Sequence, residues 1–405
     1  MKKRIFSAIA IILLLCCTGI LCSCSQTAQK TSKKNYVTIG RICPMSGEFA
    51  EYGYGTLEAE KAAVKELNEN GGIFIDALDK KLMVRYLLAD SCSTEEGAKE
   101  AAIRLIEEEN VDLIIVSHTS STVDPVSQIC EEKKVPCFCC DADMETWLAQ
   151  GDHTYSFLIS AGTMSRLDAF RDVWTETDLT SLGLITDESS AAEAFSKAVI
   201  SYCANNRITV REYNFTGNLA RTLSEAKADG ILCYLDTGTY LSLKNDLDEA
   251  GVELKCCMLV NEHLYYDALG AASLGSAFDG TYTAVAWGPS FTYQSSLTGQ
   301  DGAGLKEWWD SEYVAPCPES LGYKHGIVEV AVEALKRAMA IDADSIVKAA
   351  TELNIETVLG PVHFDEAHAV TLPCAASQWI YDAHSVGISK WSQILTPESI
   401  GKKQE

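Results

Sequence analysis

The segment that decides the fold is Tyr36–Cys43 (YVTIGRIC), which is followed at once by the loop Pro44-Met45-Ser46-Gly47. Its apolar and β-branched residues are typical of a strand. A helical pattern follows over residues 56–70, and residues 81–89 form the next strand. Strands that alternate with helices in this way predict a parallel sheet with helices on both of its faces.

The alternation continues to about residue 140 and restarts near residue 156. Further strand patterns alternate with helical ones up to residue 260, and a third block begins near residue 283. No strict internal repeat is visible. The expected architecture is therefore α/β, with two doubly wound parallel-sheet lobes, and the last block contributes to both.

The N-terminal residues are typical of a secretory signal peptide, because Lys2, Lys3 and Arg4 precede a short apolar run. The sequence Leu21-Cys22-Ser23-Cys24 resembles a bacterial lipobox, which implies removal of residues 1–23 and a lipid on Cys24. The polar residues 24–35 are expected to form a flexible tether. The alternative is an uncleaved N-terminal membrane anchor, although the apolar run is short for a membrane span.

The chain of 405 residues carries a formal net charge of −24, with 47% hydrophobic and 22% charged residues. This composition is typical of a globular protein of two or three domains. So acidic a surface excludes a nucleic-acid partner and is repelled by anionic lipid, so membrane attachment requires an anchor. We expect a bacterial protein that is a monomer outside the cytoplasmic membrane and is held to the membrane by lipid on Cys24.

The cysteines are the unusual feature of the composition. Of sixteen, four lie at or before Cys24 and twelve remain. An even number in an exported protein is compatible with a disulfide framework. Several lie in apolar strand patterns, however, which favours small buried side chains with free thiols. Cys137 and Cys140 form a C-x-x-C without a second pair at zinc spacing, so we expect no metal there.

A hydroxyl-rich run, residues 117–122 (SHTSST), follows one predicted strand and precedes a helix. Ligands of open α/β sheets bind at the carboxyl ends of the strands. Backbone N–H groups and hydroxyls at the start of a helix could hold a carboxylate or another anion. An ordinary helix N-cap is the alternative explanation.

Three acidic residues, Asp143, Asp236 and Glu262, also lie after predicted strands. Carboxylates that face a ligand suit an ammonium group; the alternative is that each is a solvated loop charge. Tyr52 and Trp147 could form apolar walls of the same site, or could be core residues.

Motifs for catalysis are missing: the sequence contains no G-x-S-x-G, H-E-x-x-H or Walker A pattern. Gly53-Tyr54-Gly55 begins a G-x-G, but Glu58 breaks the dinucleotide fingerprint. Ser345 and Lys348 match S-x-x-K without its companion motifs. We therefore expect no catalytic residue, no cofactor and no metal.

Short motifs that belong together extend from about residue 36 to 385. They include Pro44-Met45-Ser46-Gly47, Tyr52-Gly53, Asn68-Glu69-Asn70-Gly71-Gly72, Asp90-Ser91-Cys92, Glu249-Ala250-Gly251 and Gly360-Pro361-Val362-His363-Phe364-Asp365. In this order they resemble the type I periplasmic binding proteins of ABC importers, and most closely the leucine/isoleucine/valine-binding branch.

That family has two α/β lobes, joined by three crossovers, which close on a ligand. The resemblance implies that residues 36–158 and 285–359 form the first lobe and that residues 159–284 and 360–395 form the second. Residues 396–405 would be a C-terminal tail.

The resemblance also implies seven ligand-binding residues: Tyr52, Ser120, Ser121, Asp141, Asp143, Asp236 and Glu262. Ser120 and Ser121 match positions that bind the α-carboxylate of an amino acid. Asp141 matches a position that uses its backbone carbonyl. Asn261 or Glu262 matches the acidic residue that holds the ammonium group.

Departures from the family pattern affect the ligand. Asp143 replaces a hydroxyl and Asp236 an aromatic, so a branched-chain amino acid is not specifically implied. Cys92 matches a half-cystine whose partner position here is Thr119, so that disulfide is missing.

The expected function is that of a lipoprotein, not an enzyme, that captures an amino acid or a similar zwitterionic or cationic solute by hinge closure. It would deliver this solute to an ABC permease. The alternatives are a ligand sensor for a receptor and an exported hydrolase.

Overall fold

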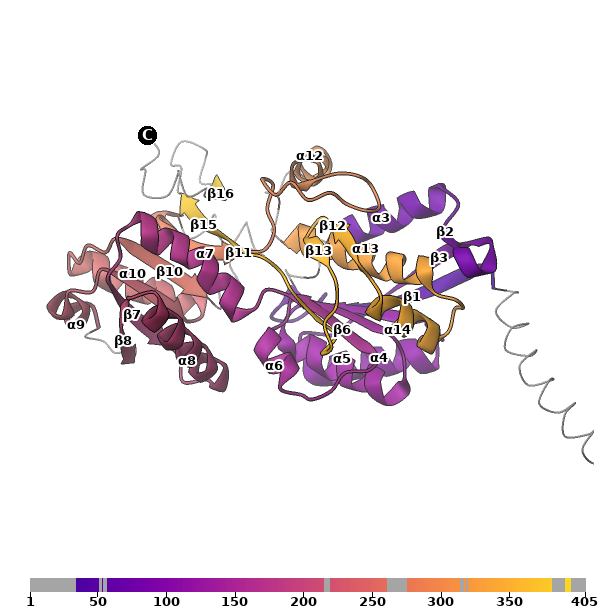
Figure 1. Ribbon diagram of the computed structural model, residues 1–405, viewed down its shortest axis with the longest axis horizontal. Helices are drawn as coiled ribbons and strands as arrows, with labels where there is room; N and C mark the ends of the chain where they lie inside the picture. The colour runs from indigo at the N-terminus through magenta and orange to yellow at the C-terminus, as the bar shows by residue number, and fades with distance from the viewer. Residues whose placement is uncertain are drawn as a thin grey trace, which may run out of the picture.

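The computed structural model describes residues 34–50, 53, 57–214, 219–260, 275–313, 317, 320–380 and 390–394. The predicted signal peptide and Cys24 lie outside these residues, as do Tyr52 and Glu262 of the predicted site. Within the described residues, no helix is long and apolar enough to cross a membrane. They form two bodies side by side, each built around one large sheet (Figure 1).

The first lobe contains a sheet of seven strands in the order β14-β6-β5-β4-β1-β3-β2. All neighbouring strands are parallel except β2, which is antiparallel to β3. The strands are β1 (Tyr36–Cys43), β2 (Ile73–Ile75), β3 (Lys80–Asp90), β4 (Leu113–Ser117), β5 (Cys137–Cys140), β6 (Ser156–Ser160) and β14 (Ala369–Thr371).

Helices cover both faces of this sheet, as the alternation predicts. One face packs on α3 (Leu57–Glu69), α12 (Gly302–Glu312), α13 (Ser320–Arg337) and α14 (Ala343–Thr351). The other face packs on α4 (Glu95–Glu107), α5 (Ser120–Lys133) and α6 (Met144–Leu148). A short turn, η1 (Asp76–Leu78), joins β2 to β3, and the hairpin of β12 (Ile355–Thr357) and β13 (Gly360–Val362) lies beside α13.

The second lobe repeats this plan with the strand order β16-β15-β11-β10-β9-β7-β8. In this sheet, β15 is antiparallel to both of its neighbours, β11 and β16. Its strands are β7 (Ser181–Thr186), β8 (Thr209–Asn214), β9 (Gly230–Tyr234), β10 (Cys256–Val260), β11 (Thr281–Val285), β15 (Ala375–Ile380) and β16 (Lys390–Ile394). One face packs on α7 (Thr163–Glu176) and α8 (Ser190–Asn205), the other on α9 (Leu219–Ala226), α10 (Thr237–Glu249) and η3 (Gly275–Phe278).

The chain crosses between the sheets after β6, after β11 and between β14 and β15. The predicted boundary at residue 360 is wrong for the last crossing. Strand β14 pairs in parallel with β6, with Val370 opposite Ile159, so residues up to 371 belong to the first sheet. The three residues of β14 are held by the free edge of β6, and this edge was not visible in the local pattern.

The centre of the first lobe is α13, whose residues from Ser320 to Leu335 are all buried. The helix lies close to the second crossover, because a Cβ at Gly322 would come within 2.1 Å of the Trp287 ring. A helix that is buried on every side is normally apolar all round. This one nevertheless carries Lys324, which is completely buried.

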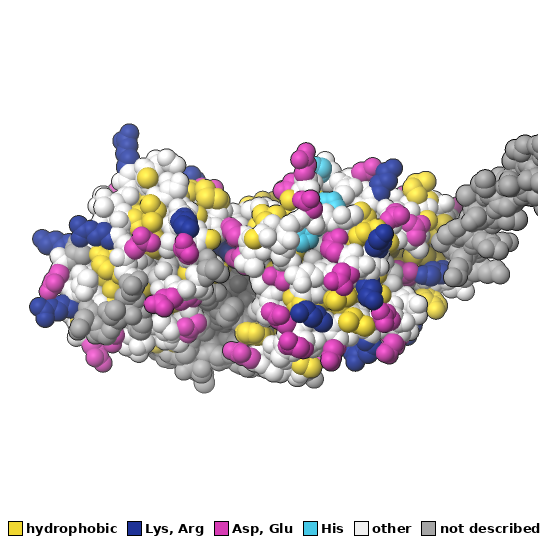
Figure 2. Space-filling view, turned by 90° about the horizontal axis from the view of Figure 1, so that it is seen from below, with side chains coloured by type: hydrophobic (Ala, Val, Ile, Leu, Met, Phe, Trp, Pro, Cys, Tyr) yellow, Lys and Arg dark blue, Asp and Glu magenta, His cyan; other side chains and the backbone are white. Residues whose placement is uncertain are grey.

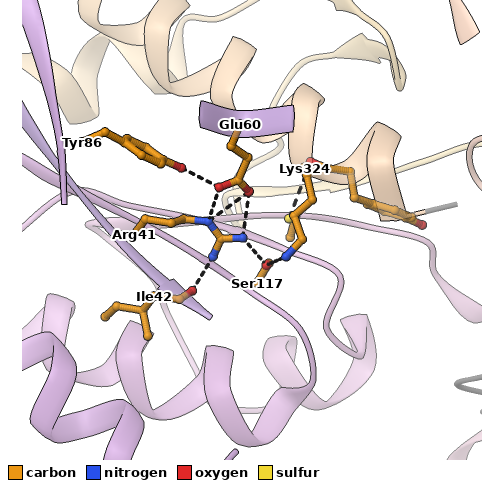
Figure 3. Close-up of polar contacts among 8 residues, drawn as sticks. Arg41, Ile42, Glu60, Tyr86, Ser117 and Lys324 are labelled. Carbon is orange, nitrogen blue, oxygen red and sulfur yellow. Dashed lines mark hydrogen bonds and ion pairs between the residues drawn. The ribbon is translucent and has the colours of Figure 1, made fainter. Parts of the chain in front are cut away.

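Lys324 belongs to a buried cluster of charges that joins α13 to β1, α3 and β4 (Figure 3). Arg41 donates from Nε to both oxygens of Glu60 at 3.0 and 2.7 Å, and from Nη2 to Glu60 at 2.8 Å. Tyr86 donates its hydroxyl to the same carboxylate at 2.6 Å. Arg41 and Lys324 both donate to the Ser117 hydroxyl, at 2.6 and 2.7 Å.

The cluster holds two cations and one carboxylate. Burial, with a smaller contribution from the neighbouring Arg41 charge, lowers the pKa of Lys324 to about 8, so it is still protonated at neutral pH. Glu60 is paired with Arg41, and Lys324 therefore adds a surplus positive charge beneath Ser117. The chain as a whole, by contrast, carries a net charge of −24, and Asp and Glu side chains are spread over both lobes on the face seen in Figure 2.

Replacing Glu60 by Gln should lower the free energy of unfolding by about 3–5 kcal/mol, because it leaves two buried cations without an anion.

Lys324→Met should leave the free energy of unfolding unchanged or raise it, because it removes the surplus charge. The folded pKa of Lys324 is below its ordinary 10.5. Stability therefore rises with pH between about 8 and 10.5 in the wild type, and any advantage of Lys324→Met should shrink over that range.

Urea denaturation at several pH values measures both effects, with Glu66→Gln on the exposed face of α3 as the matched control. A loss for Glu60→Gln no larger than for this control would contradict the account. So would an equal loss for Lys324→Met and Glu60→Gln.

All twelve cysteines after Cys24 lie in the described residues as free thiols, nine of them buried, and Cys92 alone is exposed. In protein that begins after Cys24, a thiol reagent should therefore modify one cysteine rapidly in the native state and twelve after denaturation without reductant. Cys92→Ser should abolish the rapid reaction. A denatured chain without free thiols would instead indicate six disulfides.

Candidate functional site

The carboxyl ends of the strands face each other across the connection between the lobes. Strand β6 ends at Ser160 and leads directly through Ala161 and Gly162 into α7 of the second lobe. Strand β11 ends at Val285 and leads back toward the first lobe. Because parallel strands end at the same edge of a sheet, both carboxyl edges adjoin the crossovers, where ligands of such sheets bind.

The backbone at this edge of the first lobe is strained. Five residues other than glycine have φ between 54° and 70° just after the carboxyl ends of β3, β4 and β5: Cys92, Ser93, His118, Thr119 and Asp141. In the second lobe, Asp178, Arg207 and Lys227 also have positive φ, but they follow helices, where this conformation is ordinary. Strain in non-glycine residues is concentrated at functional sites. Among the described residues, such non-glycine residues at the carboxyl ends of strands are therefore found in the first lobe.

The loop after β1 is held against this edge by Asp90. The Asp90 carboxylate accepts hydrogen bonds from the backbone N–H groups of Met45 and Ser46 at 2.8 and 3.2 Å and from the Ser46 hydroxyl at 2.5 Å. Burial opposes ionisation of Asp90, but these bonds outweigh it and lower its pKa. Only glycine fits at Gly47, which has φ of 84° and whose Cβ would lie 2.7 Å from the Cys92 carbonyl oxygen.

The hydroxyl run lies at the start of α5, which begins at Ser120, three residues earlier than the sequence pattern predicts. Thr119 is the N-cap residue, but its side chain does not cap the helix. Its hydroxyl instead contacts the Ser121 hydroxyl at 2.7 Å. The first turn therefore keeps backbone N–H groups without a side-chain cap in the described part of the chain, directly after Ser117 and the surplus charge of Lys324.

Asp141 is held by His118. The ring nitrogen Nδ1 of His118 lies 2.7 Å from Oδ2 of Asp141, and the two side chains are 1% and 14% exposed. Burial, together with the charge of Lys324, lowers the pKa of His118 to about 4. At neutral pH the imidazole is therefore neutral, and its Nδ1 is in close contact with the Asp141 carboxyl group. This contact orients the loop in which Asp141 was predicted to offer its backbone carbonyl.

Asp143 and Asp236, for which the alternative was a solvated loop charge, are both helix N-cap residues. Asp143 caps α6 by accepting a hydrogen bond from Thr146 N at 2.7 Å. Asp236 caps α10 through Thr239 N at 3.0 Å and the Thr239 hydroxyl at 2.6 Å, and that hydroxyl is the main cause of its lowered pKa. A carboxylate has about four acceptor positions, so each could also bind an ammonium group.

The structure brings Ser120 and Asp143 together: Asp143 N donates to the Ser120 hydroxyl at 3.2 Å. Tyr52 and Glu262 lie outside the described residues, as does Asn261. Trp147, a candidate wall, is a core residue, because it is completely buried and stacks on His153 with ring centroids 3.5 Å apart.

Sequence reasoning missed two residues that link the lobes. Glu145 of α6 accepts a hydrogen bond from Thr163 N at the start of α7, at 2.9 Å. Burial and then the negative charge of Asp143 raise the pKa of Tyr234 to about 12, so this second-lobe residue lies near the edge of the first. Tyr234 is the last residue of β9. Its position at the carboxyl end of a strand is the sequence feature that could have identified it as a candidate site residue.

The described residues contain no group of three or more His, Cys, Asp and Glu side chains that could hold a metal ion. The candidate site thus combines the hydroxyls and backbone N–H groups at the start of α5 with carboxylates near the carboxyl edges of both sheets. It contains hydrogen-bond donors and charges for binding a small polar molecule.

A periplasmic binding protein family model matches residues 36–383. No curated protein matches the sequence. Among solved structures, an ABC transporter substrate-binding protein from Desulfitobacterium hafniense is 18% identical, with a TM-score of 0.71 over 88% of this chain and 99% of that one.

Two other similar structures were solved with ligands. LivJ from Streptococcus pneumoniae, in complex with isoleucine, is 17% identical, with a TM-score of 0.65 over 89% of this chain and 99% of that one. A solute-binding protein of an ABC transporter from Rhodopseudomonas palustris, in complex with 3,4-dihydroxybenzoic acid, is 15% identical, with a TM-score of 0.66 over 89% and 98%. Because the family model spans most of the chain and the two-sheet fold agrees with these structures, this chain belongs to the periplasmic binding protein family, has its type I fold, and is a solute-binding protein rather than an enzyme.

Proposed function

We propose that the protein captures an amino acid, or a close derivative with a carboxylate and a cationic nitrogen, between its two lobes. It would work as an extracytoplasmic lipoprotein, anchored through Cys24, and deliver the solute to an ABC permease. The observation that carries the proposal is the start of α5, which has no side-chain cap and lies directly after Ser117, to which the buried cation Lys324 donates a hydrogen bond.

The carboxylate would bind the first turn of α5. Ser120 and Ser121 supply hydroxyls there, and the helix supplies N–H groups and the positive end of its dipole. The charge of Lys324 reaches this turn through Ser117, the last residue of β4, within a buried and weakly screened environment. The ligands of the two solved structures support this part, because isoleucine and dihydroxybenzoic acid both carry a carboxylate.

The cationic nitrogen of the ligand would bind among the predicted carboxylates of the site. Asp143, Asp236 and Glu262 would repel one another in a closed, desolvated site without a cation between them. The backbone carbonyl of Asp141 would add an acceptor whose position is set by the contact with His118. A ligand with an ammonium group therefore fits this side better than a purely anionic or apolar one.

Hinge closure would couple binding to delivery. A ligand that contacts both lobes binds the closed form more tightly and shifts the equilibrium toward it. Three crossovers join the lobes here, and the hydrogen bond between Glu145 and Thr163 ties α6 to α7 at the first. A permease that recognises the closed form would then distinguish loaded from empty protein.

Ser120→Ala should weaken binding of the preferred amino acid about tenfold, because a charge-assisted hydrogen bond contributes about 1.5–3 kcal/mol. Calorimetry with the twenty free amino acids identifies that ligand first. The amide of the same amino acid, which lacks the carboxylate, should be affected much less. Ser311→Ala on the exposed part of α12 is the control; equal losses for acid and amide would place the carboxylate elsewhere.

Glu262→Gln should also weaken the amino acid about tenfold or more, through loss of the charge that faces the ammonium group. The deaminated acid with the same side chain should bind weakly to both proteins. Glu253→Gln, between α10 and β10, removes the same charge as a control. Tight binding of the deaminated acid, unchanged by Glu262→Gln, would show that no carboxylate of this site holds a cation.

A further inference from the structure

A second, cationic cavity lies in the second lobe, at the end of the strands that is remote from the first lobe. It has a volume of about 360 Å³, which is in the range of small-ligand sites. It is formed where β7 and β8 begin, beside the end of α9, whereas the candidate solute site lies at the carboxyl ends of the strands. Its lining consists mainly of cations and hydroxyls: Thr180, Ser181, Leu182, Arg207, Thr209, Arg211, Tyr213, Lys227 and Ala228.

The cavity exists because β8 is the edge strand of the sheet and α9 is short. Thr209, Arg211 and Tyr213 alternate along β8 and therefore lie on one face. In the register of β7 and β8, Arg211 is paired with Gly183. A helix of eight residues covers only part of this face, and the uncovered part carries the charged side chains.

The charge of this cavity is opposite to that of the protein, which has a net charge of −24. Arg207, Arg211 and Lys227 form no ion pair with any acidic side chain of the described residues. Lys and Arg side chains project from this end of the second lobe, away from the first (Figure 2). An unpaired group of three cations repels itself, and this repulsion is relieved when an anion binds.

The nearest acidic group is already occupied. Asp229 accepts hydrogen bonds from Thr180 N at 2.8 Å, the Thr180 hydroxyl at 2.7 Å and Ser181 N at 2.9 Å. It also lies 3.8 Å from the Lys255 ammonium group. Its side chain is thus bound to the strand ends and Lys255 and is not part of the lining, so it leaves the three cations available.

One polar group of the lining lacks a partner. The hydroxyl of Tyr213 is buried and makes no hydrogen bond within the described residues. A buried polar atom without a partner costs free energy unless a ligand or a water supplies the missing bond. The hydroxyls of Tyr213 and Thr209 thus add neutral hydrogen-bond donors to the cations of the cavity.

We propose that this cavity is a binding site for a small oxyanion with more than one negative charge, such as phosphate or a phosphate monoester. Arginine presents planar pairs of N–H donors that match two oxygens of such an anion, and lysine adds a point charge. The hydroxyl of Tyr213 then donates to a further oxygen. The site is independent of the solute between the lobes, because it lies at the opposite end of β7 and β8.

Calorimetry of the full-length chain with inorganic phosphate tests the proposal, with detergent present to hold its N-terminal segment. Phosphate should bind at millimolar concentration or below. Arg211→Gln should weaken it about tenfold or more, since it removes charge-assisted bonds. Tyr213→Phe, which keeps the charge and the ring, should weaken it less but measurably. The control is Arg171→Gln, which removes an exposed charge from α7 and should leave phosphate binding unchanged.

The source of the phosphate group is distinguished in a second arm. Vesicles that contain phosphatidic acid, whose headgroup is a phosphate monoester, and vesicles of phosphatidylcholine alone are compared with wild-type protein and Arg211→Gln. A preference for phosphatidic acid that phosphate abolishes and Arg211→Gln lacks identifies a lipid headgroup as the ligand; no preference identifies free phosphate or a soluble ester. Absence of phosphate binding, or equal binding by wild type, Arg211→Gln and Tyr213→Phe, would overturn the proposal.

Discussion

The burial of two cations with a single carboxylate in the first lobe constrains much of the rest of the structure. Charges of this kind are costly to bury unless they are paired and hydrogen-bonded. Arg41 comes from the first strand, Glu60 from the next helix and Lys324 from the segment that returns after the second lobe. The cluster therefore joins the two distant parts of the chain that form this lobe, and it leaves one positive charge directed at the start of α5.

Under the proposed function, that surplus charge would give the two lobes different roles. In the first lobe, positive-φ residues other than glycine gather at the ends of three strands, and His118 orients Asp141. In the second lobe, the positive-φ residues follow helices, and Asp236 caps its own helix. We infer that the first lobe binds the carboxylate in a rigid, preorganised site, while the second contributes to selectivity and to closure.

Much of the fold could be predicted from local patterns, because parallel sheets with covering helices leave a strong alternation in the sequence. The third crossover could not, since the three residues of β14 become a strand only by pairing with β6. Two of the predicted site residues, Ser120 and Asp143, lie in different loops that the structure brings together. Sequence reasoning could not recognise Arg41, Glu60 and Lys324 as one cluster, because they are far apart in the chain and each alone resembles a surface charge.

Native mass spectrometry of the full-length protein, purified without denaturation, tests the central claim most directly. Any molecule that remains bound is released and identified by its mass and fragmentation. The account predicts a small molecule with both a carboxylate and an amine that is protonated at neutral pH. A bound solute without a carboxylate, such as a neutral sugar or a simple polyamine, would contradict it.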